Sequence, residues 1–279
     1  MEQNKIATAL SLLRKLPPSK IHYNTNALSN LMPDEADELL QKVDKPLEIG
    51  VCSQTNLQYI KSEFNRDGDS FRSPHSNQYD PPIDDAVYPS NDVRQLEEKA
   101  NTLFQEYMKL YYQGGICNIY FWDKENGGFA CAFLMKKEVE LAKGIKKGTW
   151  DSINVVDVKV DEQNKKKITY KCTGSVVLEM ILNDDGAGDV NISGSLTKSK
   201  EDVRLYDGNI DINSFHLENI GRIVEDLESV LRTHLDTIYV GKTKENIFTT
   251  RSQEGYIQME QTKKNLAINI IDRANNQKN

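Results

Sequence analysis

The best candidate for an ion-binding site in the sequence is a polar segment that starts at Asn65. Asn65, Asp67 and Asp69 have the alternate spacing of the first ligands in a calcium-binding loop. The sixth position of such a loop is Ser70 instead of glycine, and the twelfth is Ser76 instead of glutamate. Because the bidentate carboxylate is missing, we expect a hydrogen-bonded surface loop and no calcium site.

A second motif, Gly241-Lys242-Thr243, matches the end of a phosphate-binding loop. That loop requires another glycine five residues before Gly241, and it follows a strand. Asp236 occupies the required position, and the preceding segment has helical periodicity. We therefore expect Gly241 to end a helix and Lys242 to lie on a basic surface.

The nucleophiles and potential metal ligands show no catalytic spacing. The four histidines form no HExxH or HxH pattern, and the four cysteines form no CxxC pair. Three of the cysteines lie in or beside apolar runs, which predicts reduced, buried thiols. We expect no enzymatic activity, no metal and no cofactor.

The overall charge of the chain argues against a nucleic-acid partner. The 279 residues include 35 basic and 42 acidic side chains, so the formal charge is −7 and the pI is near 5.3. We expect no nucleic-acid partner, because domains that bind nucleic acid are usually basic. No apolar stretch of 18 residues occurs, and the N-terminal segment has no small-residue cleavage site, so neither a membrane span nor a secretory signal is expected.

The first half of the chain is predicted to be mainly helical. Apolar residues spaced by three and four indicate three short helices in residues 1–50. Residues 51–89 are rich in turn formers and show no sustained period, so this segment is either functional or held in place by other elements. Ser90 can cap a stronger helix that ends at Gly114. Its predicted apolar face comprises Val93, Leu96, Ala100, Leu103, Phe104, Tyr107, Leu110 and Tyr111.

The hydrophobic period then changes from that of a helix to that of strands. Turn signals separate the apolar runs, and no helix lies between them, which predicts an antiparallel meander that needs a cover on one face. The five expected strands are 116–122, 129–136, 152–160, 168–182 and 190–197. A helix from about Ser214 to Tyr239 is the expected cover.

The C-terminal segment 242–279 differs from the rest in charge. It has seven basic and four acidic residues, so it carries +3 on a chain of −7. Its apolar residues lie on one helical face, and a basic amphipathic helix can bind a partner groove or an anionic surface. Packing of this helix on the chain's own core is the alternative.

Several long strings in the sequence resemble a known family. They are RKLPP, NRDGDSFRSPHSNQYDPP, the helix end YYQGG, WDSINVVDV, NIGRIVEDLES and IYVGKTK. They resemble the beta subunit of the heterodimeric F-actin capping protein. The resemblance is close over about residues 5–250 and looser in the tail.

The resemblance implies a mixed alpha+beta fold. It has an N-terminal three-helix stalk, a central loop-rich globule, a five-stranded antiparallel sheet covered by a long helix, and a C-terminal amphipathic tentacle. The alpha subunit continues the sheet, which would cover an open edge. The implied parts are 1–50 (stalk), 51–112 (globule and connecting helix), 113–200 (sheet), 201–245 (long helix) and 246–279 (tentacle).

The resemblance also implies a function without catalysis. With an obligate alpha subunit, such a chain caps the barbed, fast-growing ends of actin filaments independently of calcium and blocks subunit exchange. Implied regulators are proteins with capping-protein-interaction motifs and acidic phosphoinositides. The implied location is the cytoplasm, in the actin cytoskeleton and cell cortex.

Individual residues follow from the matching strings. Arg232, Lys242 and Lys244 match a basic actin-facing patch, and Lys15, Asp44 and Tyr79 match the surface for regulator peptides. Lys15 stands where arginine is usual, which weakens a bidentate contact. Ala267 replaces a larger leucine on the tentacle. The tentacle's expected apolar face is Leu266, Ala267, Ile268, Ile270 and Ile271.

Two other classes of function are alternatives to an interaction protein. An enzyme with a pocket assembled around residues 65–82 would need a cofactor, a metal or a reactive thiol, and no motif for one is present. A membrane-surface adaptor would use the basic tail, and its binding to liposomes would have to persist in high salt.

Overall fold

The computed structural model describes residues 2–125, 128–142, 145–184 and 188–235, together with the single residues 238 and 261. The chain divides into two units after Leu235, and the elements below belong to the first unit. This unit combines helices with a five-stranded antiparallel sheet, which confirms the predicted mixed class.

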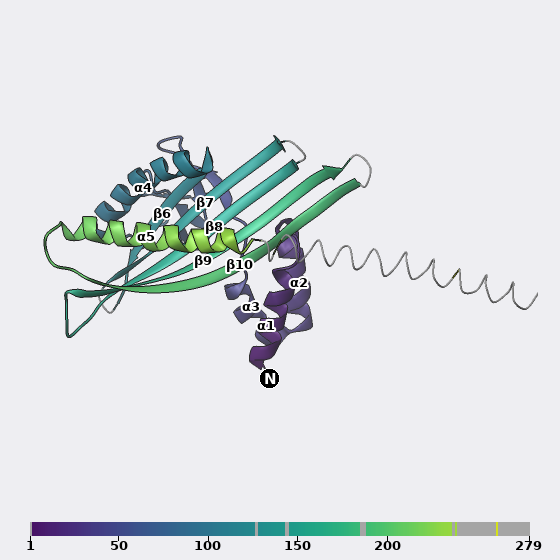
Figure 1. Cartoon of the computed structure of the whole chain (residues 1–279), viewed down its shortest axis with the longest axis horizontal. Helices are drawn as coiled ribbons and strands as arrows, with labels where there is room; N and C mark the ends of the chain where they lie inside the picture. The colour runs from purple at the N-terminus through teal and green to yellow at the C-terminus, as the bar shows by residue number, and fades with distance from the viewer. Residues whose placement is uncertain are drawn as a thin grey trace, which may run out of the picture. The chain divides into compact units, whose positions relative to one another are not determined.

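Three short helices at the N-terminus pack on one another. They are α1 (Glu2–Leu13), α2 (Ile21–Leu31) and α3 (Ala36–Lys42), and the turns η1 (Pro18–Lys20) and η2 (Pro33–Glu35) connect them. Each turn starts with a proline, whose fixed φ and missing N–H suit the start of a helix. Their shared core is Ala9, Leu13, Ile21 and Leu39. The helices group together at one margin of the sheet (Figure 1).

The polar segment that follows is held in place by the rest of the fold. It contains β1 (Glu48–Val51), β2 (Gln58–Lys61), β3 (Arg66–Asp67), β4 (Ser70–Arg72) and β5 (Tyr79–Asp80). The buried Asn65 side chain donates to the carbonyls of Ile60 (3.1 Å) and Arg72 (2.9 Å). The Asn65 side chain therefore connects parts of the segment to one another. Ile60 also bonds to Asn118 at 2.7 Å and to Tyr120 at 2.9 Å, so the segment is held in place by another element of the fold.

The sheet is a meander of five strands, as predicted. They are β6 (Ile116–Asp123), β7 (Phe129–Ala142), β8 (Ile145–Val160), β9 (Lys167–Asp184) and β10 (Gly188–Leu205), in the spatial order β10-β9-β8-β7-β6. β7, β8 and β10 are clearly longer than predicted. The extra residues of β10 include Lys198, Glu201, Asp202 and Arg204, which hide the two-residue apolar period on which the prediction depended.

Two long helices lie across one face of this sheet, α4 (Asn91–Tyr112) and α5 (Ile212–Thr233) (Figure 1). Their apolar stripes and the strands beneath form the largest core, which includes Ala100, Phe133 and Leu227. Two leucines of the predicted α4 face, Leu103 and Leu110, are instead exposed. The packed stripe of α4 passes through Val93, Leu96, Ala100, Met108 and Tyr112.

The opposite face of the sheet is covered near β6 and β7. There Leu47 and Ile60 pack on Tyr120, Ala132 and Leu134. All four cysteines are free and buried, as predicted. Within the described residues, no helix is both long and apolar enough to cross a membrane.

Candidate functional site

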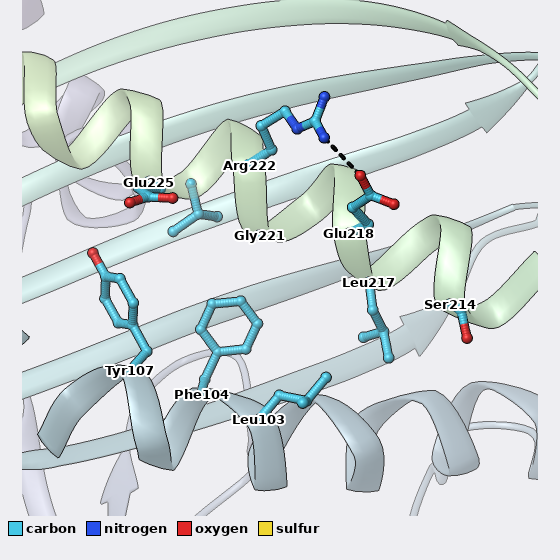
Figure 2. Close-up of a pocket in the computed structure, with 10 residues that line it drawn as sticks. Leu103, Phe104, Tyr107, Ser214, Leu217, Glu218, Gly221, Arg222 and Glu225 are labelled. Atoms are coloured by element: carbon cyan, nitrogen blue, oxygen red, sulfur yellow. Dashed lines mark hydrogen bonds and ion pairs between the residues drawn. The ribbon is translucent and has the colours of Figure 1, made fainter. Parts of the chain in front are cut away.

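A groove runs between α4 and α5 on the outer side of the sheet (Figure 2). Its volume is about 540 Å³. Leu103, Phe104 and Tyr107 line it from α4, and Leu217 and Gly221 are among the residues from α5. A Cβ atom at Gly221 would lie 3.2 Å from the Phe104 ring, so the glycine allows the helices to approach closely here. The floor of the groove is thus apolar.

The rim of this groove is charged and exposed. Arg222 donates to Glu218 at 2.6 Å, and Glu225 lies about two turns from Glu218 along the same helix (Figure 2). The lining contains no cysteine and no histidine. In the described part of the chain, no group of three or more His, Cys, Asp or Glu side chains is placed to hold a metal ion. The chemistry that this groove offers is therefore contact with apolar groups.

Beyond this groove, α4 and α5 end side by side. Phe104 faces Gly221 at mid-helix, and Tyr112 contacts Glu228 and Arg232 at the C-terminal ends, so the helices run in the same direction. Two cations lie at these ends. Arg232 is in the last turn of α5, and the Lys137 ammonium donates to the Tyr112 carbonyl. Cations are favoured there, because a helix C-terminus carries partial negative charge.

The Arg232 side chain is held by the ring and the hydroxyl of Tyr112. Its Nη2 donates to the Tyr112 hydroxyl at 2.6 Å, and its guanidinium carbon lies 4.9 Å from the Tyr112 ring centroid. The side chain nevertheless remains 37% exposed. This geometry combines a hydrogen bond with a cation–π contact and leaves part of the guanidinium accessible.

Beneath Arg232 lies a buried carboxylate, Glu228. Its Oε2 accepts from the Tyr112 hydroxyl at 2.8 Å, and its Oε1 accepts from Asn154 at 2.8 Å and from the Ser152 hydroxyl. The Arg232 Nη2 is 3.8 Å from Glu228 Oε2. Buried charges need such partners, and here α4, α5 and β8 each supply at least one group of the network.

The electrostatics of this cluster fix where its protons reside. Burial, and next the charge of Glu228, raise the pKa of Tyr112 far above its ordinary value, so the hydroxyl keeps its proton. Partial burial opposes the charged form of Arg232, but the hydrogen bond that Arg232 donates to Tyr112 and the nearby negative charge outweigh it, and the pKa of Arg232 is raised. The cluster therefore presents one permanent positive charge at the surface.

The three residues of the predicted regulator surface belong to different segments of the chain. Asp44 accepts from the Ser195 hydroxyl at 3.2 Å and lies 3.9 Å from Arg14 Nε, and Lys15 follows Arg14 directly. Tyr79 lies in β5, where its partly buried hydroxyl donates to the Val87 carbonyl at 3.0 Å. None of the described contacts of Tyr79 reaches Asp44 or Arg14.

Comparison with known proteins decides the family. A family model described as F-actin capping protein, beta subunit, matches residues 6–247. The chain belongs to the F-actin capping protein beta-subunit family. Relatives agree: the F-actin-capping protein subunit beta of Dictyostelium discoideum is 42% identical over 97% of both chains, and that of Caenorhabditis elegans is 41% identical over 93% of both.

A solved structure supports the fold of this capping-protein family member. The homodimeric actin capping protein alpha subunit from Plasmodium berghei has a TM-score of 0.50 and 15% sequence identity to this chain. The match covers 90% of this chain and 97% of the other. Because the identity is low, this likeness concerns the arrangement of helices and sheet alone.

The structure places part of the predicted capping-protein site. Arg232 lies in the cluster at the end of α5. Lys242, Lys244 and the predicted tentacle face lie outside the described residues. Tyr112, Glu228 and Lys137 carry no motif in the sequence that points to this cluster. The Glu228–Arg232 pair was detectable from its four-residue spacing, but Tyr112 comes from a helix 120 residues earlier.

Proposed function

We propose that this chain forms a heterodimer with a capping-protein alpha subunit and caps the barbed, fast-growing ends of actin filaments. Capping blocks both addition and loss of actin subunits, requires no calcium and involves no catalysis. Membership of the beta-subunit family carries this proposal. A loop at residues 65–76 without the bidentate carboxylate of a calcium loop is consistent with calcium independence.

A comparison of the two edges of the sheet, β6 and β10, indicates where the alpha subunit would pair. The β6 edge is covered by side chains of α4: Asn101 donates to the Ile119 carbonyl at 2.8 Å and accepts from the Ile119 N–H at 3.0 Å, and Glu97 accepts from the Phe121 N–H at 2.7 Å. The β10 edge is long, and in the described part of the chain no strand besides β9 pairs with β10. An open edge of this length is a template for pairing with another chain.

The side chains along the distal half of β10 suit a partner. The N-terminal helices reach this edge at Ser195, whose N–H donates to the Arg14 carbonyl at 3.0 Å. Further along, Val203 and Leu205 are exposed, Leu205 to 68%. We propose that the alpha subunit pairs along β10 beyond Ser195 and continues the sheet. The P. berghei neighbour, which has this fold and is described as homodimeric, is consistent with pairing of two such folds.

The proposed contact with actin combines charge and apolar area. Arg232, Lys242 and Lys244 form the basic patch that steers the encounter with acidic actin, so capping should weaken as salt rises. The apolar face of the tentacle, Leu266, Ala267, Ile268, Ile270 and Ile271, then binds a groove on actin. At position 267 the smaller alanine loses about 1–2 kcal/mol of apolar contact relative to leucine.

Regulation and location are part of the same proposal. Proteins with capping-protein-interaction motifs bind the surface near Lys15, Asp44 and Tyr79, and acidic phosphoinositides bind the basic patch. The chain acts in the cytoplasm, in the actin cytoskeleton and at the cell cortex. With a pI near 5.3, it is not expected to bind nucleic acid.

The test is elongation of pyrene-labelled actin from filament seeds, with this chain co-expressed with an alpha subunit. We expect substoichiometric arrest of barbed-end growth that is unchanged by calcium chelation. Growth from pointed ends, measured with barbed ends already blocked, is the control and should be unaffected. Undiminished barbed-end growth with a folded heterodimer would contradict the proposal.

A further inference from the structure

Arg232 differs from an ordinary surface arginine in how firmly it is fixed. An exposed arginine samples many rotamers, and it loses that freedom when it binds a partner. Here the guanidinium already donates to the Tyr112 hydroxyl at 2.6 Å and lies over the same ring at 4.9 Å. Its conformation is therefore restricted before any partner arrives, although 37% of the side chain is exposed.

The Tyr112 hydroxyl also keeps the guanidinium apart from the buried carboxylate. It accepts from Arg232 and donates to Glu228 at 2.8 Å, so it joins two charged groups that are themselves 3.8 Å apart. Without the hydroxyl, the guanidinium has two alternatives. It can move inward to pair directly with Glu228, or it can lose its anchor and sample other rotamers. Either change reduces the ordered positive charge at the surface.

The carboxylate itself is fixed from the sheet side. The Asn154 amide donates to Glu228 Oε1 at 2.8 Å, and the Ser152 hydroxyl donates to the same oxygen. Asn154 and Ser152 belong to the central strand β8 and are fully buried. The position of Arg232 is thus set by the rigid sheet through a chain of hydrogen bonds.

We infer that Tyr112 is a positioning residue for the actin contact: its hydroxyl holds the Arg232 guanidinium ordered and outward, ready to bind a carboxylate on the filament end. A guanidinium can bind a carboxylate through two parallel hydrogen bonds, and an ordered donor loses less entropy in doing so. This inference rests on the proposed function, because it assigns a role within the capping contact of Arg232.

The test is a double-mutant cycle on barbed-end affinity, measured with the full-length chain in its heterodimer. The variants are Tyr112→Phe, Arg232→Ala and their combination. Phenylalanine keeps the ring and removes only the hydroxyl. We expect Tyr112→Phe to weaken capping about three- to tenfold, the range that corresponds to ordering one long side chain. In the Arg232→Ala background the same change should have no further effect, because Tyr112 acts through Arg232.

Tyr170→Phe is the matched control. Tyr170 is also buried, and its hydroxyl contacts His216 at 2.9 Å, whereas the Tyr112 hydroxyl contacts both Arg232 and Glu228; Tyr170 is not part of the Arg232 network. The thermal midpoint of Tyr170→Phe should fall no further than that of Tyr112→Phe, and its capping affinity should be unchanged. A purely structural role for Tyr112 would give the two variants the same affinity.

The outcomes separate this inference from the proposed function. A wild-type heterodimer that does not arrest barbed-end growth overturns both. Capping by the wild type, with Arg232→Ala as strong as wild type, overturns the contact of Arg232 and hence the positioning role. Capping that is weakened equally by Tyr112→Phe with and without Arg232 overturns the positioning role alone. Loss of the Tyr112→Phe effect in the Arg232→Ala background supports it.

Discussion

Two buried glutamates, Glu97 on α4 and Glu228 on α5, are both completely shielded from solvent, but they hold arginines differently. Glu97 binds Arg72 directly through both carboxylate oxygens, at 2.8 and 2.7 Å, and the Arg72 side chain is only 4% exposed. Glu228 reaches Arg232 through the Tyr112 hydroxyl, and Arg232 stays partly exposed. In the direct pair, Glu97–Arg72, the positive charge is enclosed. In the relayed pair, in which Tyr112 lies between Glu228 and Arg232, the positive charge of Arg232 remains available to a partner.

The surroundings of the two carboxylates support this distinction. Glu97 also accepts from the Phe121 N–H at 2.7 Å, so it joins the polar segment, α4 and β6 into one structure. Glu228 joins α5 to β8 and to the last residue of α4. We therefore expect changes near Glu97 to reduce stability, and changes near Glu228 to reduce binding more than stability.

The largest effect should come from breaking the enclosed pair with Arg72→Met. This change removes the bidentate partner of Glu97 and leaves Arg94 as the remaining cation on that carboxylate, so the cost should be at most the value of about 3–5 kcal/mol that applies to a broken buried ion pair. We expect a clear fall in the thermal midpoint of the heterodimer, with normal barbed-end affinity for the protein that remains folded. Arg66→Met is the control. Arg66 pairs with Glu63 and Asp69 at an exposed position, so its loss should cost at most about 1 kcal/mol.

Equal destabilisation by both variants would show that the enclosed pair has no special structural role. Loss of capping by folded Arg72→Met protein would show that the two carboxylates are less distinct than their geometry indicates.

The second prediction uses pH, because both arginines stay charged in the acid range while a group at the other end of α5 titrates. His216 is buried against Phe129, and its Nδ1 lies 2.9 Å from the Tyr170 hydroxyl. Burial lowers the pKa of His216 from 6.5 to about 4. The unfolded chain then binds a proton at a higher pH than the folded chain, so stability is complete above pH 6.5 and falls as the pH decreases toward 4.

The expected loss near pH 4 is about 3 kcal/mol from this residue. It should appear in urea denaturation curves measured between pH 7 and pH 4. His216→Gln should flatten the curve over this interval, because glutamine keeps polar atoms near Tyr170 but does not titrate. An unchanged slope in that variant would assign the acid sensitivity to the carboxylates instead.

A smaller loss of stability is expected from Gly174→Ala. This substitution should push α5 away from the sheet close to Glu228. The added Cβ would lie 2.9 Å from a Leu227 methyl and would also meet the Asn154 side chain, which binds Glu228. Overpacking of this kind costs about 1–3 kcal/mol. If Glu228 positions Arg232, capping affinity should fall as well. Gly208→Ala is a control, since nothing lies within 4 Å of a Cβ there, although its φ of +83° adds local strain.

A loss of stability in Gly174→Ala with unchanged capping would indicate that Arg232 does not depend on the exact position of α5. That result would weaken the distinction between Glu97, which we expect to affect stability, and Glu228, which we expect to affect binding.

The sequence predicted the large elements well, because their patterns are local. The strand containing Ile168, Tyr170 and Cys172 alternates clearly, and α5 has an apolar stripe with a helical period. The two glutamate clusters were not predicted. Each joins residues distant in the sequence, as Tyr112 and Glu228 show, and a buried charge has no signature until the fold brings its partners together.

The same limit explains two details of the helices. Leu103 belongs to the apolar period of α4 but lines the groove, because α5 and the sheet contact only part of that stripe. Arg232 could be placed in the site only by resemblance to a family. No local pattern distinguishes it from Arg222, ten residues earlier in the same helix.

This pair of arginines provides the smallest predicted effect and the sharpest test of the relayed pair. Arg222 is 51% exposed, and its described ion pair, with Glu218 at 2.6 Å, spans one turn of α5. Such pairs contribute about 0.3–0.5 kcal/mol. Arg222→Ala should therefore change the thermal midpoint little and leave barbed-end affinity within about twofold of wild type. Arg232→Ala removes the same charge from the same helix and should weaken capping much more. Equal losses would mean that net charge along α5 matters rather than an ordered guanidinium at its end, and a greater loss for Arg222→Ala would place the actin contact over the groove between α4 and α5.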